Sequence, residues 1–116
     1  MENFEKETIA AIATALSDSG IGIVRISGEN AIYIVDSIFR STSGKKILTK
    51  VQSHTIHYGY IVDKDENIID EVMTSVMKAP KSYTMEDTVE INCHGGVLVM
   101  QKVLETVLQA GARLAE

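Results

Sequence analysis

Two charged residues stand inside segments that are otherwise apolar and rich in β-branched side chains. Arg25 interrupts residues 21–26 (IGIVRI), and Glu90 lies within residues 88–92 (TVEIN). A guanidinium keeps its charge in a folded protein, so Arg25 must meet an acceptor, either a carboxylate of the same chain or a bound anion. Glu90 is ordinary surface if its sheet face is open. If that face is covered, the carboxylate needs donors, and a planar heterocycle with adjacent N–H groups supplies two.

A pair of glycines follows the Glu90 segment, at the start of a helical pattern. Gly95 and Gly96 would let a ligand approach the backbone closely, and the helix N-terminus would offer N–H groups to an acceptor. A tight turn between strand and helix explains the same glycines equally well. His94 either lines a cleft or is a simple junction residue. Cys93 continues an alternating apolar pattern, which favours a buried structural thiol over a nucleophile.

Other kinds of site lack the residues that they need. Gly44-Lys45 is followed by Lys46, and Phe39 stands where the first glycine of a phosphate-binding loop belongs. Nucleotide hydrolysis by these residues alone is therefore not expected. Arg25 also occupies the third glycine position of a dinucleotide-binding motif. The spacing of the three histidines and Cys93 matches no metal site, so we expect no bound metal.

The composition indicates one small, acidic, globular domain. The chain has 116 residues, of which 45% are hydrophobic and 23% charged. Its 16 acidic and 11 basic side chains give a net charge of −5, which argues against independent, salt-driven binding to nucleic acid. A single cysteine excludes an internal disulfide framework and suits a reducing cytosol. We expect neither a membrane span nor an export signal.

Several segments carry the pattern of β-strands. The clearest are residues 21–27, 51–62, 68–78 and 88–93. The second and third of these flank a turn at residues 63–67 and predict an antiparallel hairpin. Residues 8–14 fit either a strand or a helical turn, and residues 112–114 begin another strand.

Two segments carry helical periodicity. Residues 29–39 predict an amphipathic helix with Ser27 as its N-cap and Glu29 in its first turn. A second helix begins after Gly96 and ends at Gly111, a typical C-terminal stop. Its apolar stripe consists of Val97, Met100, Val103, Leu104, Val107 and Leu108.

The order of these elements predicts an α+β fold, in which two main helices pack on one face of a mixed β-sheet. We also expect parallel neighbours at the two strand–helix junctions. Polar stretches predict loops at residues 17–20, 41–46 and 79–87, with Tyr83 as an anchor and Thr84 as a cap in the last. Residues 1–7 predict a charged, frayed arm.

Four motifs resemble the N-terminal domain of the MnmE (TrmE) family of tRNA-modification GTPases. They are residues 8–14 (TIAAIAT), 21–28 (IGIVRISG), 80–87 (PKSYTMED) and 89–96 (VEINCHGG). They occur in the order typical of the family, and the resemblance extends from about Thr8 to Glu116. Two places in the chain depart from it. Met85 stands where the family usually has glycine, and Ala15-Leu16 where it usually has Pro-Pro.

The resemblance implies a fold similar to the folate-binding domain of glycine-cleavage aminomethyltransferases. It also implies homodimerisation and a bound tetrahydrofolate derivative, either 5-formyl- or 5,10-methylene-tetrahydrofolate, as one-carbon donor. By motif, Arg25 and Glu90 match folate contacts of the family, and a further lysine contact lies beyond Glu116. Full-length members are GTP hydrolases with a helical domain and an inserted GTPase, which binds GTP, Mg and K. Together with the FAD-dependent partner MnmG (GidA), they modify C5 of the wobble uridine of tRNA in the cytoplasm.

Residues 1–116 are thus expected to be a single folate-binding and dimerisation domain without the GTPase and helical parts, and not an enzyme on their own. Transfer RNA would be a substrate of the complex only, and no membrane would be involved. One alternative is a purely structural dimerisation module without folate affinity, in which Arg25 and Glu90 form an ion pair. Another, a stand-alone enzyme similar to the aminomethyltransferases, is less favoured because the chain is too short to enclose both substrates.

Overall fold

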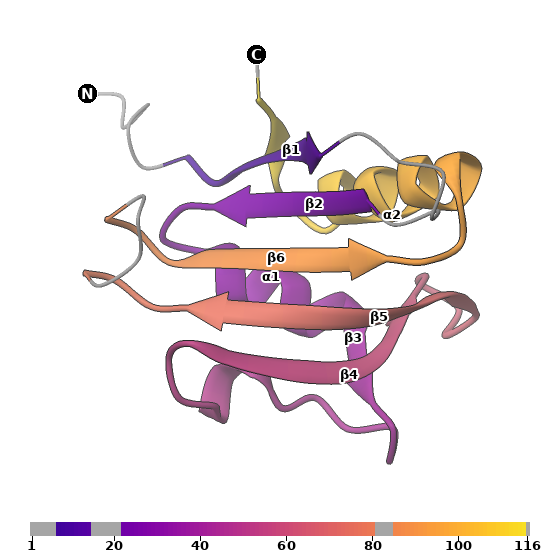
Figure 1. Ribbon diagram of the computed structural model, residues 1–116, viewed down its shortest axis with the longest axis horizontal. Coiled ribbons are helices and arrows are strands. Elements are labelled where there is room, and N and C mark those ends of the chain that lie inside the picture. Colours follow the sequence, from indigo (N-terminus) through magenta and orange to yellow (C-terminus); the bar gives the residue numbers. More distant parts are fainter. Residues whose placement is uncertain (1–6, 15–21, 81–84, 116) are drawn as a thin grey trace.

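The structure is a computed structural model that describes residues 7–14, 22–80 and 85–115 (Figure 1). Several predicted features lie outside these residues: most of the N-terminal arm, the loop at residues 17–20, the Ala15-Leu16 departure, and Tyr83 and Thr84. The described residues form one seven-stranded sheet in the order β3-β4-β5-β6-β2-β1-β7. Its strands are β1 (Ile9–Thr14), β2 (Gly22–Ser27), β3 (Phe39–Ser41), β4 (Thr55–Val62), β5 (Ile68–Met77), β6 (Thr88–Cys93) and β7 (Arg113–Leu114).

Two α-helices cover one face of this sheet and leave the other face open. Helix α1 (Ala31–Ile38) and helix α2 (Val97–Gln109) both lie behind the sheet in Figure 1. A short 3-10 helix at Leu48–Lys50 precedes the β4–β5 hairpin. The predicted α+β class and the mixed sheet with its helices on one face are confirmed, and residues 8–14 resolve as a strand.

The expectation of parallel neighbours at the strand–helix junctions is wrong. Both neighbours of β2 and both neighbours of β6 are antiparallel, and the described sheet has its parallel pair at β1 and β7. Helix α1 connects β2 to β3 at the far edge, and α2 connects β6 to β7 beyond β2 and β1. The strands joined by each helix are therefore separated by other strands.

The core lies between the helices and the covered sheet face. Alternate residues of the central strands are fully buried there, as the period of two requires. They include Val24, Ile26, Val72, Val76, Val89 and Ile91, which pack in one cluster with Val35 of α1 and with Val103 and Val107 of α2. The prediction that Val97 belongs to the buried apolar stripe of α2 is wrong, because Val97 is 53% exposed.

The start of α1 also differs from the prediction. Ser27 is the last residue of β2, and the helix begins only at Ala31, so neither Ser27 nor Glu29 lies at its N-terminus. The Oγ1 atom of Thr8 accepts a hydrogen bond from the N–H group of Asn30, at 3.0 Å. Thr8, 22 positions earlier in the chain, thus binds the residue that directly precedes the helix, and no side-chain hydrogen bond caps the helix itself. At its other end, Phe39 leaves the helix and begins β3, a strand that the sequence pattern did not predict.

Candidate functional site

Arg25 and Glu90 face each other across β2 and β6. They are direct partners in the antiparallel ladder, and Nε of Arg25 donates a hydrogen bond to Oε2 of Glu90 at 2.7 Å. The neighbouring residues Val24 and Ile91 are fully buried beneath the helices, so Arg25 and Glu90 lie on the open face. Two acceptors were considered for Arg25, a carboxylate of the same chain and a bound anion. The structure shows the first, because Arg25 forms an ion pair with Glu90.

Both members of this pair are partly shielded from water. The Arg25 side chain is 38% exposed, and the Glu90 side chain is 18% exposed. A pair in such a position is neither fully solvated nor desolvated, so its charges still act on a neighbouring polar group. Two residues further along β2, Ser27 Oγ donates a hydrogen bond to Glu86 Oε1 at 3.4 Å. These contacts give the open face polar groups next to its apolar ones.

A hollow of about 320 Å³ lies beside Arg25. It is lined by residues 9–13 of β1, by Arg25 and Ser27 of β2, and by Ala115. Glu90 is not among the lining residues and lies on the other side of the guanidinium, on β6. The wall is mostly aliphatic, with one cationic group and one hydroxyl group. Such a lining suits a flat, largely apolar ligand with a polar edge.

The junction between β6 and α2 is a tight turn, which supports the structural interpretation of the glycine pair. Gly96 has φ +97°, and a Cβ atom on Gly95 would lie 2.7 Å from the side chain of Val99. Oδ2 of Asp70 accepts hydrogen bonds from the N–H groups of His94, at 2.8 Å, and Gly95, at 3.3 Å. Asp70 escaped the sequence analysis, although its position in phase with the buried Val72 was an available signal.

His94 and Cys93 lie side by side in sequence at this junction but differ in exposure. His94 is exposed, and its Nδ1 atom lies 3.2 Å from the carbonyl oxygen of Glu71. Cys93 is fully buried, and this burial, with a smaller contribution from the charge of Asp70, raises the pKa of its thiol to about 12. A thiol with such a pKa is protonated and inert at neutral pH. The interpretation of Cys93 as a buried structural thiol is confirmed.

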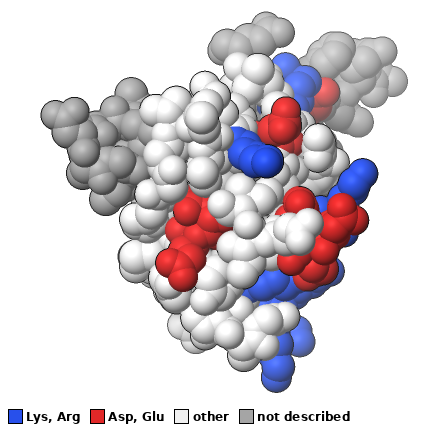
Figure 2. Space-filling model, turned by 90° about the vertical axis from the view of Figure 1, so that its right-hand side faces the viewer, with Lys and Arg blue, Asp and Glu red and all other residues white. Residues whose placement is uncertain are grey.

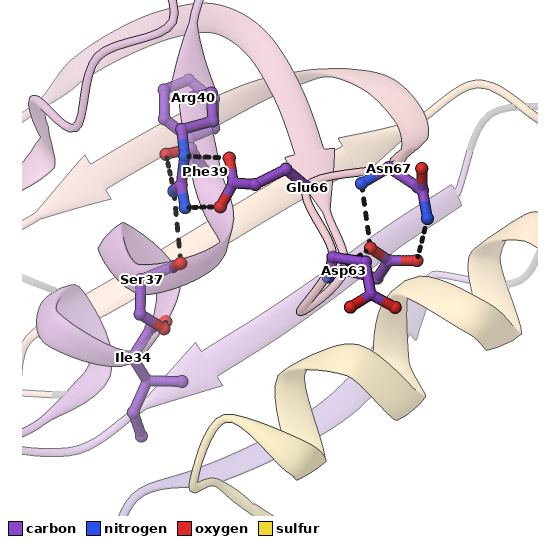
Figure 3. Close-up of polar contacts among 8 residues, drawn as sticks. Ile34, Ser37, Phe39, Arg40, Asp63, Glu66 and Asn67 are labelled. Carbon is purple, nitrogen blue, oxygen red and sulfur yellow. Dashed lines mark hydrogen bonds and ion pairs between the residues drawn. The ribbon is translucent and has the colours of Figure 1, made fainter.

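A second polar cluster lies at the β4–β5 turn (Figure 3). Arg40 donates to both carboxylate oxygens of Glu66, at 3.1 and 2.7 Å, and to the carbonyl oxygens of Ser37 and Phe39. The hydrogen bond from Arg40 lowers the pKa of Glu66. Asp63 accepts from the N–H groups within its own turn, chiefly that of Asn67, and this lowers its pKa. The cluster ties the hairpin turn to β3 and is a structural element.

Among the described residues, no three His, Cys, Asp or Glu side chains are grouped so that they could hold a metal ion. No helix in the described ranges is long and apolar enough to cross a membrane. Figure 2 shows the side where β6 ends and α2 begins, with acidic and basic groups interspersed among uncharged areas rather than a broad basic patch.

Comparison with known proteins decides the family. Residues 8–116 match the sequence family described as "GTP-binding protein TrmE N-terminus". The chain belongs to this TrmE N-terminal family. It is 63% identical, over 95% of its length, to the tRNA modification GTPase MnmE of Lachnoclostridium phytofermentans, and 57% identical to that of Thermoanaerobacter pseudethanolicus. In both cases it covers 24% of the relative, so the chain spans about a quarter of the length of these curated relatives.

The backbone at Met85 is unusual for a residue with a side chain. At this position, where the resemblance implies glycine, Met85 has φ +66°. This backbone region is open to glycine and sterically costly for residues with a side chain. A glycine at this position therefore has a conformational reason, and Met85 adopts the same backbone at a cost.

Proposed function

We propose that the chain is the folate-binding and homodimerisation domain of a tRNA-modification GTPase. The proposal takes the family and the names of the relatives as its starting point. The observation that carries it is the arrangement of Arg25 and Glu90 as neighbours on the open sheet face, with Arg25 at the wall of a hollow. Arg25 borders the hollow and Glu90 lies beside it on β6, so a ligand in the hollow would meet the guanidinium first and reach the carboxylate across it.

In this proposal, Glu90 accepts hydrogen bonds from the N–H edge of the pterin ring, and Arg25 engages an acceptor on the folate. A carboxylate has about four lone-pair sites, so the bond from Arg25 does not prevent Glu90 from accepting further donors. Hydrogen bonds with a charged partner are roughly twice as strong as neutral ones. The Arg25 bond would also hold the Glu90 carboxylate in one orientation, which reduces the entropy lost on binding.

The activity of the whole protein extends this proposal beyond residues 1–116. The longer protein would hydrolyse GTP in a separate domain and, with the FAD-dependent partner MnmG, modify C5 of the wobble uridine of tRNA in the cytoplasm. The tetrahydrofolate derivative would supply the one-carbon unit. With a net charge of −5, this domain would serve as the cofactor and assembly module, and other parts of the complex would contact tRNA.

A structural assembly module without folate affinity is the second candidate. Two observations favour it. The Arg25–Glu90 bond satisfies both charges within the chain, and the open sheet face carries exposed apolar residues at Ile56, Tyr58 and Met73. An apolar patch of this kind is typical of a protein–protein interface. In this case the ion pair only stabilises the sheet.

Calorimetric titration with 5-formyltetrahydrofolate tests the folate proposal. We expect the wild-type chain to bind and Glu90→Gln to bind at least about tenfold more weakly, because the neutral amide loses charge-assisted hydrogen bonds. Glu105→Ala, which removes an exposed carboxylate on α2, is the matched control and should bind like wild type. Equal affinity of wild type and Glu90→Gln would refute the role of Glu90. Sedimentation at several concentrations that shows a dimer without folate affinity would favour the assembly module.

A further inference from the structure

Ala11 lies directly opposite Arg25 in the β1–β2 ladder. Directly opposed residues of an antiparallel pair share a sheet face, with their Cβ atoms about 4.5–5.5 Å apart. The guanidinium of Arg25 thus has the Glu90 carboxylate on the β6 side and a single methyl group on the β1 side. Ala11 and Arg25 both line the hollow of about 320 Å³, so the methyl group borders the space next to the charge.

Packing in the core does not explain why residue 11 has a small side chain. Alanine is depleted in β-strands, where β-branched residues are favoured. Ala10, the preceding residue, is fully buried and packs in the core cluster, which accounts for its size. Ala11 is half-buried, lies outside that cluster, and borders open space on the opposite sheet face. Strand propensity and packing would therefore both accept a valine here.

We infer that Ala11 is a specificity-determining residue of the proposed folate site, because its methyl group leaves room beside Arg25 for the flat ring of the ligand. This inference rests on the proposed function. The ring would lie against the methyl group of Ala11, with its N–H edge toward Glu90 and an acceptor toward Arg25. A leucine at position 11 carries three more carbon atoms and would fill this space, because the aliphatic stem of an arginine packs readily against an apolar neighbour.

The test compares variants that differ in size at position 11. Ala11→Val and Ala11→Leu should bind 5-formyltetrahydrofolate at least about tenfold more weakly than wild type, as overpacked sites do. Ala11→Ser stays small and should bind within about threefold of wild type, which separates size from sequence change. Ala79→Leu is the matched control, since Ala79 is an exposed alanine that lines a different hollow. It should bind normally.

Thermal unfolding and circular dichroism of each variant accompany the titrations. Wild-type affinity in folded Ala11→Val and Ala11→Leu would overturn the inference and leave the folate proposal standing. Loss of the fold in both variants, with Ala11→Ser intact, would also overturn it, because residue 11 would then serve the sheet rather than the ligand. Absence of binding by the wild-type chain would instead refute the proposed function, and with it this inference.

Discussion

Arg25 and Glu90, 65 residues apart in sequence, are direct cross-strand partners on the sheet face that the helices leave open, with Nε and Oε2 2.7 Å apart. This relationship fixes the position of both charges, because each stands on a central strand whose opposite face is buried in the core. A one-residue shift in the register of β2 against β6 would move one of them into the core. The pair therefore helps to specify the register of the sheet and also belongs to the candidate site.

The ion pair should contribute modestly to stability. In a double-mutant cycle of Arg25→Met and Glu90→Gln, we expect a coupling free energy of about 0.5–1 kcal/mol, because Arg25 is more than a third exposed and water screens the pair. Urea denaturation of wild type, the two single variants and the double variant measures this coupling. The coupling should fall at high salt. A coupling of zero at low salt would show that the contact has no energetic role.

Met85→Gly should stabilise the protein. The left-handed backbone of Met85, with φ +66°, costs a residue with a side chain about 1–2 kcal/mol. Glycine removes this cost but raises the entropy of the unfolded chain, so we expect a net gain of about 0.5–1 kcal/mol in the free energy of unfolding. Met73→Gly is the control, because Met73 is an exposed residue of β5 and the same change should destabilise it. A loss of stability in Met85→Gly would contradict the assigned backbone conformation.

Gly28→Ala should destabilise the protein far more than Gly44→Ala. Both glycines have positive φ, but a Cβ atom on Gly28 would lie 2.6 Å from Cα of Thr8, whereas nothing lies within 4 Å of one on Gly44. The clash would displace Thr8, whose hydroxyl group binds the N–H group of Asn30 just before α1, so we expect a loss of about 2–4 kcal/mol for Gly28→Ala against about 1 kcal/mol for Gly44→Ala. Chemical denaturation distinguishes the two. Similar losses in both variants would mean that β1 moves aside freely.

Stability should fall in acid partly through the β4–β5 turn. The pKa values of Glu66 and Asp63 are lowered in the folded state by their hydrogen bonds. Groups with a lowered folded pKa stabilise the protein above their unfolded pKa, about 4, and this contribution is lost as the pH falls through the folded pKa. In Arg40→Met, the pKa of Glu66 measured by NMR should rise toward its ordinary value while that of Asp63 changes little. An unchanged Glu66 pKa would contradict the assigned cause.

Local periodicity was sufficient to predict most of the elements whose residues pack against the core. Residues 88–93 alternate cleanly and form β6, and the stripe around Met100, Val103 and Val107 forms the buried face of α2. The errors arose where distant residues decide the outcome. Asn30, just before α1, is bound by Thr8, and Phe39 of β3 pairs with Ile61 of the hairpin. Neither contact has a signature in the neighbouring sequence.

The same distinction applies to the candidate site. Arg25 and Glu90 were identifiable as single anomalies, because each interrupts an apolar strand. Their partnership depends on which strands become neighbours, which local pattern does not determine. Ala11 escaped notice because an alanine carries no anomaly by itself, and Asp70 was missed although it lies in phase with the buried Val72. Their roles follow from the hollow beside Arg25 and from the N–H groups of His94 and Gly95.

A crystal structure of the chain with 5-formyltetrahydrofolate tests the central claim most directly. We predict that the pterin edge lies within hydrogen-bond distance of the Glu90 carboxylate, with an acceptor of the ligand at the Arg25 guanidinium and the ring over Ala11. A ligand bound at any other surface, or an Arg25–Glu90 pair left without ligand at saturating concentration, would contradict the folate site and leave the pair a structural role.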